Sequence, residues 1–319
     1  MQLNAKLDVD MVALQADDEV TCLLTLTAPV PEEIADRPGE TLIMVVDRSG
    51  SMAGERLQSV RTALHALADR LKPHDTFGVV VFDHEAVVQV PARPMADHHL
   101  PTVHSLIEAI QAGGTTDLCS GYLLGLSEAR RHLSPTGASL ILLSDGQANQ
   151  GITDPAQLGE LAAQARADQV TTTTLGIGAG YDETLLAELA TRGSGSHRFA
   201  HTDDDAAAVV SEESGDLLSK SIINAVARIR PTDEGLIERI SCYQMIPRWV
   251  ETDPDGTKVL VMALGDLYAG EQREVLLRIQ VPALAALGLH HLADVRIEYI
   301  ALPELVQQTI TWPLSVNAV

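Results

Sequence analysis

The chain is poor in cysteine, aromatic residues, positive charge and long apolar runs. Its three cysteines, Cys22, Cys119 and Cys242, lie far apart, which predicts reduced thiols rather than a disulfide framework or a zinc site. Lys and Arg number 22 against 44 Asp and Glu, and the net charge of −22 argues against non-specific binding of nucleic acid. Because no window of about 18 apolar residues occurs, no segment is expected to span a membrane.

The N-terminus also lacks a basic stretch followed by an apolar core. The sequence MQLNAKLDVDMV is therefore not expected to act as a signal peptide. Together with the reduced thiols, this predicts a cytoplasmic protein. A length of 319 residues is enough for two domains with sizeable cores.

The most informative stretch is TLIMVVDRSGSM at residues 41–52. TLIMVV is a short, largely β-branched apolar run, which predicts a strand buried on both faces. The run stops at Asp47, and Ser49 and Ser51 follow at alternate positions before a helix predicted over 54–71 from its apolar spacing. The chain thus places one carboxylate and two hydroxyls at the carboxyl end of a parallel strand, where open α/β sheets bind ligands.

Two later segments have the same chemical character. GGTTD at residues 113–117 precedes an amphipathic stretch, and SLILLSDG at residues 139–146 is a second apolar run that ends on a carboxylate and a glycine. The donors that the first stretch contributes are hard oxygens, with no thiolate or imidazole among them. Such donors suit Mg²⁺ or a similar hard cation.

The order D-x-S-x-S, then G-G-T-T-D, then L-L-S-D-G closely resembles the von Willebrand factor type A family over roughly residues 39–210. The resemblance implies a metal-ion-dependent adhesion site that holds Mg²⁺, or else Mn²⁺ or Ca²⁺. The residues that match its five positions are Asp47, Ser49, Ser51, Thr116 and Asp145. Thr116 is chosen over Thr115 because its spacing to Gly121 fits the start of the helix in that family.

The rhythm of the chain predicts two kinds of architecture. Strands alternate with helices from residue 41 onward, which indicates a Rossmann-like, open and mostly parallel α/β sheet with helices on both faces. After about residue 223 the pattern changes to short alternating segments, with a hairpin turn at Asp255-Gly256. Two more strands are predicted at 7–14 and 19–30.

From these patterns we expect a type A domain at 39–222 and one all-β sandwich formed by residues 1–38 and 223–319. The reason is that the α/β unit has no place for the two N-terminal strands, whereas six C-terminal strands are few for a closed sandwich. Finer expectations are a closing helix over 203–226 and a Pro-rich connection over 29–40. We also expect an antiparallel edge strand over 85–92, because its Pro91 could not lie in a central strand.

The predicted ligands also have an ordinary structural interpretation, which is that they cap helix N-termini. Five matches in the right order favour a common site instead. Arg48 could steer an acidic partner or be a solvated side chain, and Asp83 could belong to the same rim. Cys119 is interpreted as a small buried thiol.

Metal-dependent protein binding is the function that we expect. Two carboxylates and three hydroxyls do not fill the six positions around Mg²⁺, and in the family the open position accepts an Asp or Glu carboxylate of a partner. A bound cation would also invert the local charge of a chain that would otherwise repel an acidic partner. The alternatives are an accessory subunit of an ATP-driven AAA+ complex and a metal-assisted hydrolase. The sequence shows no nucleophile–base arrangement, so an enzyme is not expected.

Overall fold

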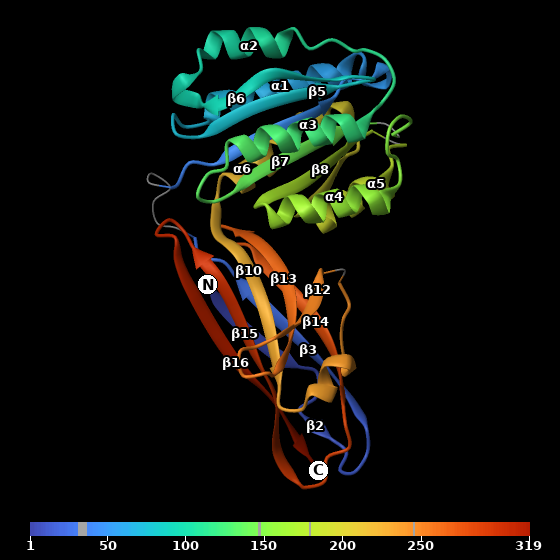
Figure 1. The fold of residues 1–319 in the computed structure, drawn as a ribbon, viewed down its shortest axis with the longest axis vertical. Coiled ribbons are helices and arrows are strands. Elements are labelled where there is room, and N and C mark those ends of the chain that lie inside the picture. Colours follow the sequence, from blue (N-terminus) through green and yellow to red (C-terminus); the bar gives the residue numbers. More distant parts are fainter. Residues whose placement is uncertain (31–36, 146–147, 179, 245) are drawn as a thin grey trace. The chain divides into compact units, whose positions relative to one another are not determined.

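The computed structural model describes residues 1–319 apart from 31–36, 146–147, 179 and 245, and it contains two compact units (Figure 1). One unit is α/β and comprises residues 37–218. The other is all-β and combines the described part of residues 1–36 with residues 219–319. Gly146 of the L-L-S-D-G motif and part of the Pro-rich connection therefore lie outside the described residues.

The α/β unit is built on one six-stranded sheet with the order β6-β5-β4-β7-β8-β9. Neighbouring strands are parallel except for β5 and β6, so β6 is an antiparallel edge strand, as predicted from Pro91. Strands β4, β5 and β7 are buried at every residue, as expected for apolar runs at the centre of a parallel sheet. The strand bounds are β4 Thr41–Asp47, β5 Thr76–Phe82, β6 Ala86–Pro94, β7 Ala138–Ser144, β8 Val170–Ile177 and β9 Ser194–Ala200.

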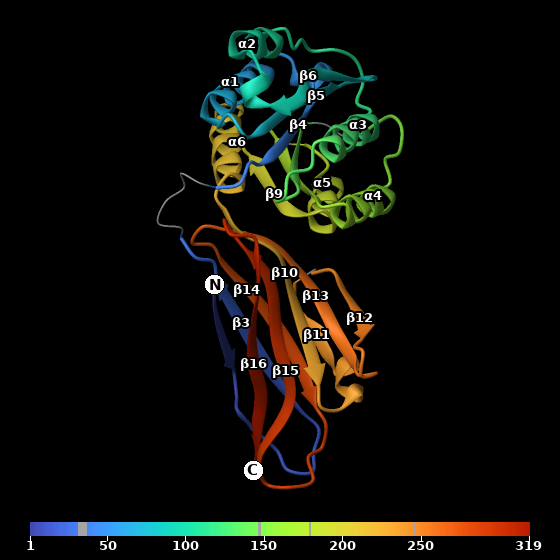
Figure 2. The ribbon, with the colours of Figure 1, turned by 60° about the vertical axis from the view of Figure 1, so that its left-hand side comes forward.

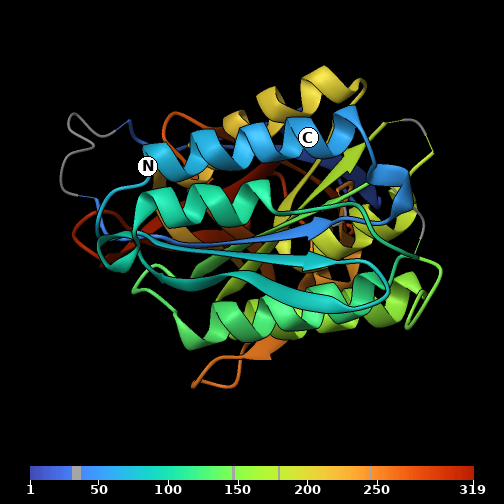
Figure 3. The same ribbon diagram turned by 90° about the horizontal axis from the view of Figure 1, so that it is seen from above.

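Helices cover both faces of this sheet, with α1, α2 and α6 on one face and α3, α4 and α5 on the other (Figure 3). The helix bounds are α1 Glu55–Arg70, α2 Leu100–Glu108, α3 Leu118–Arg131, α4 Pro155–Ala167, α5 Glu183–Arg192 and α6 Asp203–Leu217, with short 3₁₀ helices η1 Gly50–Met52 and η2 Met95–Asp97. Helix α3 approaches β4 closely, because a Cβ atom on Gly125 would lie 2.3 Å from Val45 Cγ2. Among the described helices, none is long and apolar enough to cross a membrane.

The all-β unit consists of two sheets packed face to face around one apolar core (Figure 2). One sheet has the order β1-β3-β14-β11 and the other has the order β12-β13-β10-β15-β16-β2. Both ends of the chain therefore contribute to the same sandwich, and the predicted fold class is confirmed. The strand bounds are β1 Gln2–Leu7, β2 Met11–Val12, β3 Asp18–Thr27, β10 Lys220–Pro231, β11 Ile240–Cys242, β12 Arg248–Thr252, β13 Lys258–Tyr268, β14 Gln272–Val281, β15 Gly288–Ala301 and β16 Val306–Ala318, with a 3₁₀ helix η3 at Glu234–Arg239.

The N-terminal strand β3 occupies an internal position in its sheet. It pairs with β1 on one side and with ten residues of β14 on the other. Alternate side chains of β3 are buried in the core, in agreement with the period of two in the sequence. These buried residues are Val20, Cys22, Leu24 and Leu26.

Two sequence-based boundaries were wrong. The strand predicted at 7–14 is replaced by β1 and the short β2, because the Asp8 carboxylate accepts the amides of Val9 and Thr21 and ends the first strand. The closing helix predicted over 203–226 ends at Leu217, and residues 220–226 belong to β10. Pairing of β10 with β13 and β15 overrides the helical spacing of this segment. The predicted hairpin is confirmed, since Gly256 has φ +89° in the turn between β12 and β13.

Candidate metal centre

The D-x-S-x-S and L-L-S-D-G segments meet at one edge of the α/β sheet. Asp47 is the last residue of β4, and Asp145 directly follows the neighbouring strand β7. Parallel strands present their carboxyl ends at the same edge, so the two carboxylates lie side by side in the fold. Both residues are buried, with 0% of Asp47 and 5% of Asp145 exposed.

Hydrogen bonds join four of the five predicted ligands. The Ser49 amide donates to Asp47 Oδ1 over 2.7 Å, and Ser49 Oγ lies 3.1 Å from Ser51 Oγ. Ser51 Oγ in turn donates to Asp145 Oδ1 over 2.8 Å. The structure thus brings Asp47, Ser49, Ser51 and Asp145 into one cluster of oxygen atoms.

The loop that carries the fifth predicted ligand, Thr116, is bonded to the loop that carries Ser49 and Ser51. The Gly113 amide donates to the Arg48 carbonyl over 2.6 Å, and the Gly50 amide donates to the Gly114 carbonyl over 3.0 Å. These two bonds tie the G-G-T-T-D loop to the D-x-S-x-S loop. Thr116 is 3% exposed whereas Thr115 is exposed, which places the chosen threonine on the inner side of the loop.

Burial raises the pKa of Asp47 to about 6. Hydrogen bonds from Ser144 and Ser49 favour the charged carboxylate, but the nearby charge of Asp145 disfavours it. Ser144 Oγ donates to Asp47 Oδ2 over 2.6 Å, a role that the sequence did not reveal. A buried carboxylate beside a second carboxylate is the electrostatic environment in which a bound cation gives the largest gain.

The Arg56 guanidinium also reaches the cluster, and sequence reasoning missed it. Its Nη1 atom pairs with Asp145 Oδ2 and lies 3.4 Å from the Ser51 carbonyl oxygen. It also packs against Gly178, where a Cβ atom would come within 2.8 Å of Nη2. Arg56 lies in the first turn of α1, where a positive charge opposes the helix dipole, and this mismatch is the sequence signal that could have indicated it.

Residues 41–213, more than half of the chain, match the family model of the von Willebrand factor type A domain. The chain belongs to this family. The match covers all six strands of the α/β sheet, and it leaves out the segments that connect this unit to the sandwich. The resemblance to this family that the three sequence motifs indicated is therefore confirmed.

Several curated proteins are similar to the type A chain. Uncharacterized protein sll0103 of Synechocystis sp. is 26% identical over 81% of this chain and 61% of its own length. Uncharacterized protein YfbK of Escherichia coli is 28% identical over 57% of this chain and 32% of its own length. Human inter-alpha-trypsin inhibitor heavy chain H4 is 30% identical over 56% of this chain and 20% of its own length. The chain thus spans less than two thirds of each of these relatives.

Solved structures extend the likeness to both units of the type A chain. A von Willebrand factor type A protein from Catenulispora acidiphila has a TM-score of 0.78 and covers 99% of this chain and 73% of its own, with 17% identity. The ArnB paralog VWA2 from Sulfolobus acidocaldarius has a TM-score of 0.66 and covers 100% of this chain and 76% of its own, with 15% identity. At these identities the likeness shows the fold alone.

Two oxygen–oxygen separations in the cluster of this type A domain are compatible with neighbouring ligands of one Mg²⁺ ion. Neighbouring ligands of an octahedral Mg²⁺ are about 2.9 Å apart when the metal–oxygen distances are about 2.0–2.1 Å. The separations of 3.1 Å between Ser49 Oγ and Ser51 Oγ and of 2.8 Å between Ser51 Oγ and Asp145 Oδ1 lie on either side of that value. The described residues hold no group of three or more His, Cys, Asp or Glu placed around a metal, so hydroxyls would have to complete the donor set.

Other residues at this edge have structural roles. Helix α1 has Gly54 at its N-cap and α3 has Asp117, whereas Ser49 makes no side-chain capping bond to η1. From sequence, Arg48 is interpreted as a side chain that steers a partner or is solvated. Its Nη2 atom lies 3.3 Å from Asp83 Oδ2 and forms an ion pair with it. Asp83 also accepts the amides of Glu85 and Gly114 and therefore braces the neighbouring loops. Cys119 is buried, as predicted.

Removal of the Arg56 charge is expected to strengthen divalent-metal binding. The guanidinium occupies one oxygen of Asp145 and adds a positive charge beside the cluster. We expect Arg56→Gln to raise Mg²⁺ affinity about tenfold, because solvent screening of the partly exposed guanidinium reduces its repulsion of the ion to about 1.4 kcal/mol. Calorimetric titration would measure the change.

The matched control for this prediction is Arg70→Gln. It removes the same charge from the last turn of α1, about 20 Å away along the helix, where screening is strong. Mg²⁺ affinity should stay unchanged in this variant. A loss of affinity in Arg56→Gln would show instead that Arg56 orients Asp145 for the metal.

Proposed function

We propose that the chain is a metal-dependent protein-binding module. In this proposal Asp47, Ser49, Ser51, Thr116 and Asp145 would hold Mg²⁺, or else Mn²⁺ or Ca²⁺. The observation that carries the proposal is the continuous oxygen cluster at the carboxyl end of β4 and β7, with spacings suited to an octahedral cation. When bound, the ion would supply positive charge and at least one coordination position that the five side chains leave open.

The chain's own residues define the direction from which a partner would approach. Ser51 is exposed, whereas Asp47, Ser49 and Thr116 are buried. The cluster is therefore reached from the side of Ser51. The two buried carboxylates hold charge at the base of the cluster, so a donor from a partner would enter opposite them.

A carboxylate is the partner group that this arrangement favours. The chain carries a net charge of −22, so an acidic partner would be repelled everywhere except beside a bound cation. An Asp or Glu side chain is also a hard oxygen donor, which matches the cation that the cluster suits. The combination gives selectivity for an acidic side chain at one position and discourages non-specific contact elsewhere.

Immobilised peptides that contain one Asp or Glu test this proposal directly. We expect them to capture the chain in Mg²⁺ and to lose it in chelator, whereas matched peptides with Asn or Gln should bind at least tenfold more weakly. Capture should persist in moderate salt, because salt screens charges beyond a Debye length of about 10 Å but does not displace a metal–carboxylate contact. Surface plasmon resonance with and without chelator provides the measurement.

Thr116→Ala and Thr115→Ala form the matched pair of variants. Loss of the buried hydroxyl should weaken capture at least tenfold, whereas loss of the exposed one should not. If chelator did not reduce capture by the peptides, the peptides would have to contact another surface of the chain. Chelator-sensitive retention of an ATPase from the source cell, without any peptide capture, would favour the ATP-driven assembly instead.

A further inference from the structure

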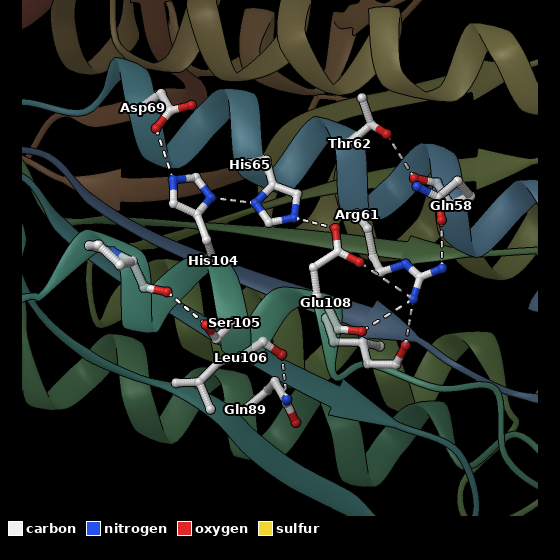
Figure 4. A network of polar contacts seen from close by, with 12 residues as sticks. Gln58, Arg61, Thr62, His65, Asp69, Gln89, His104, Ser105, Leu106 and Glu108 are labelled. Carbon is white, nitrogen blue, oxygen red and sulfur yellow. Dashed lines mark hydrogen bonds and ion pairs between the residues drawn. The ribbon is translucent and has the colours of Figure 1, made fainter.

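Two histidines meet between α1 and α2, away from the oxygen cluster (Figure 4). The rings of His65 in α1 and His104 in α2 meet edge to edge, with centroids 4.7 Å apart and planes inclined by 23°. Their Nδ1 atoms face each other in direct contact. The side chains are half-buried, with 22% of His65 and 30% of His104 exposed.

Each ring is anchored by a carboxylate of the opposite helix. His65 Nε2 lies 2.8 Å from Glu108 Oε1, and His104 Nε2 lies 3.0 Å from Asp69 Oδ1. The sequence places these groups as H-x-x-x-D in α1 and H-x-x-x-E in α2, one helical turn apart. The structure crosses the two pairs, so that Asp69, His104, His65 and Glu108 form one chain of contacts between the helices (Figure 4).

Hydrogen-bond chemistry determines what can lie between the two Nδ1 atoms. An ionised carboxylate only accepts hydrogen bonds, so both Nε2 atoms must carry a hydrogen. A neutral imidazole protonated at Nε2 has a bare lone pair at Nδ1. Two such lone pairs would repel each other at this contact. A cation shared by the two nitrogens, either a proton or a metal ion, removes the conflict.

We propose that His65 and His104 form a second metal site, which takes a transition-metal ion such as Zn²⁺ through the two Nδ1 atoms. Metal-binding histidines commonly donate their other N–H to a carboxylate, which fixes the tautomer and makes the ligand more basic. Both imidazoles here have that carboxylate. Nitrogen donors also suit Zn²⁺, Ni²⁺ or Cu²⁺ and not Mg²⁺, so this site differs in selectivity from the oxygen cluster.

The geometry needs only a small adjustment to accept the ion. A tetrahedral Zn²⁺ holds two ligand nitrogens about 3.3 Å apart. The two rings lie between the helices but are partly exposed, so their Nδ1 atoms can move to this separation without opening a core. The described residues hold no group of three or more His, Cys, Asp or Glu around one point, so water or a donor from another molecule would complete the coordination.

A metal ion bound by both histidines would link α1 and α2, the two helices that flank the oxygen cluster. Helix α1 begins just after Ser51, and α2 ends just before the loop that carries Thr116. Helix α2 is short and buries only Val103 and Ile107 against the rest of the unit. An ion that binds both helices in the folded state would therefore slow the local opening of α2.

Zn²⁺ titration by calorimetry tests the site, in excess Mg²⁺ and in an Asp47→Asn background so that the oxygen cluster does not contribute. We expect one Zn²⁺ per chain in the parent and its loss in His65→Ala and in His104→Ala. The exposed His99, at the N-cap of α2, gives the matched control His99→Ala, which should keep full binding. Amide exchange in α2 should slow with Zn²⁺ in the parent and in the control only.

The anchoring carboxylates give a second, milder test. Asp69→Asn and Glu108→Gln keep the shape of the side chains and should each weaken Zn²⁺ binding about 10- to 100-fold. Equal Zn²⁺ stoichiometry and affinity in the parent and in both histidine variants would overturn the proposal, and the pair would then share a proton. Unchanged affinity in both carboxylate variants would also contradict it. Neither result depends on whether the oxygen cluster binds Mg²⁺.

Discussion

Asp47→Asn is expected to abolish Mg²⁺ binding and, at the same time, to stabilise the metal-free α/β unit. Asparagine has nearly the shape of aspartate: its Oδ1 can accept from the Ser49 amide, and its Nδ2 can donate to Ser144 Oγ, since a hydroxyl also accepts. It removes a charge that lies fully buried beside Asp145. The variant therefore separates the electrostatic requirement for the metal from the packing requirement of the fold.

The pH dependence follows from the raised pKa of Asp47. Burial shifts this pKa from 3.8 to about 6, so the folded protein binds the proton more tightly than the unfolded chain does. The buried charge therefore costs stability above pH 6, and the cost disappears as the pH falls towards 3.8. Two pKa units correspond to about 2–3 kcal/mol, which is the stabilisation expected for Asp47→Asn at pH 7.5 without metal.

Denaturant unfolding of the α/β unit at pH 7.5 and pH 4, in chelator and in Mg²⁺, measures this effect. In chelator the variant should be more stable at pH 7.5, and the advantage should be nearly gone at pH 4. Mg²⁺ at about a thousandfold excess over the dissociation constant should reverse the order, because the parent then gains about 4.1 kcal/mol, more than the advantage of the variant.

Asp182→Asn is the matched control, since Asp182 caps α5 by accepting the Leu185 amide and lies outside the oxygen cluster. It should keep Mg²⁺ binding and show no stabilisation. Mg²⁺ binding that survives in Asp47→Asn would remove Asp47 from the set of ligands. A metal-free variant that is less stable than the parent at pH 7.5 would show that the charge of Asp47 is compensated within the fold.

The residues that could be predicted from sequence are those placed by local rules. Asp47 and Asp145 follow apolar runs, and the carboxyl ends of such parallel strands must share one edge of the sheet. Ser49 and Ser51 are fixed by their distance from Asp47 along the chain. The fold class was predictable for the same reason, because strand and helix periods are properties of short segments.

The contacts that could not be predicted depend on which helices pack together. Arg56 meets Asp145 across 89 positions of sequence, and His65 meets His104 across 39. Nothing in either segment indicates its partner, since the helices could have packed on different faces. The end of α6 at Leu217 has a similar cause, because the next residues have partners in β13 and β15 that a helical pattern does not reveal.

Deletion of residues 1–30 is expected to prevent the sandwich from folding while the α/β unit remains folded. We propose that the sandwich is a folding domain that needs both ends of the chain. The deletion removes β1, β2 and β3, and it leaves β14 without its ten-residue partner. It also takes four fully buried side chains of β3 out of the core. Amide exchange should then show full protection in β4, β5 and β7 but little in β14 and β16.

Point substitutions in β3 distinguish loss of the core from loss of chain length. Leu24 is fully buried between the sheets, whereas Leu23, on the opposite face of the same strand, is only half-buried. We expect Leu24→Ala to destabilise the sandwich by about 2–5 kcal/mol and Leu23→Ala to have a clearly smaller effect. Limited proteolysis and denaturant unfolding would measure both variants. A truncated chain whose β14 stays as protected as in the parent would contradict the proposal, because that strand would then not need β3 as a partner.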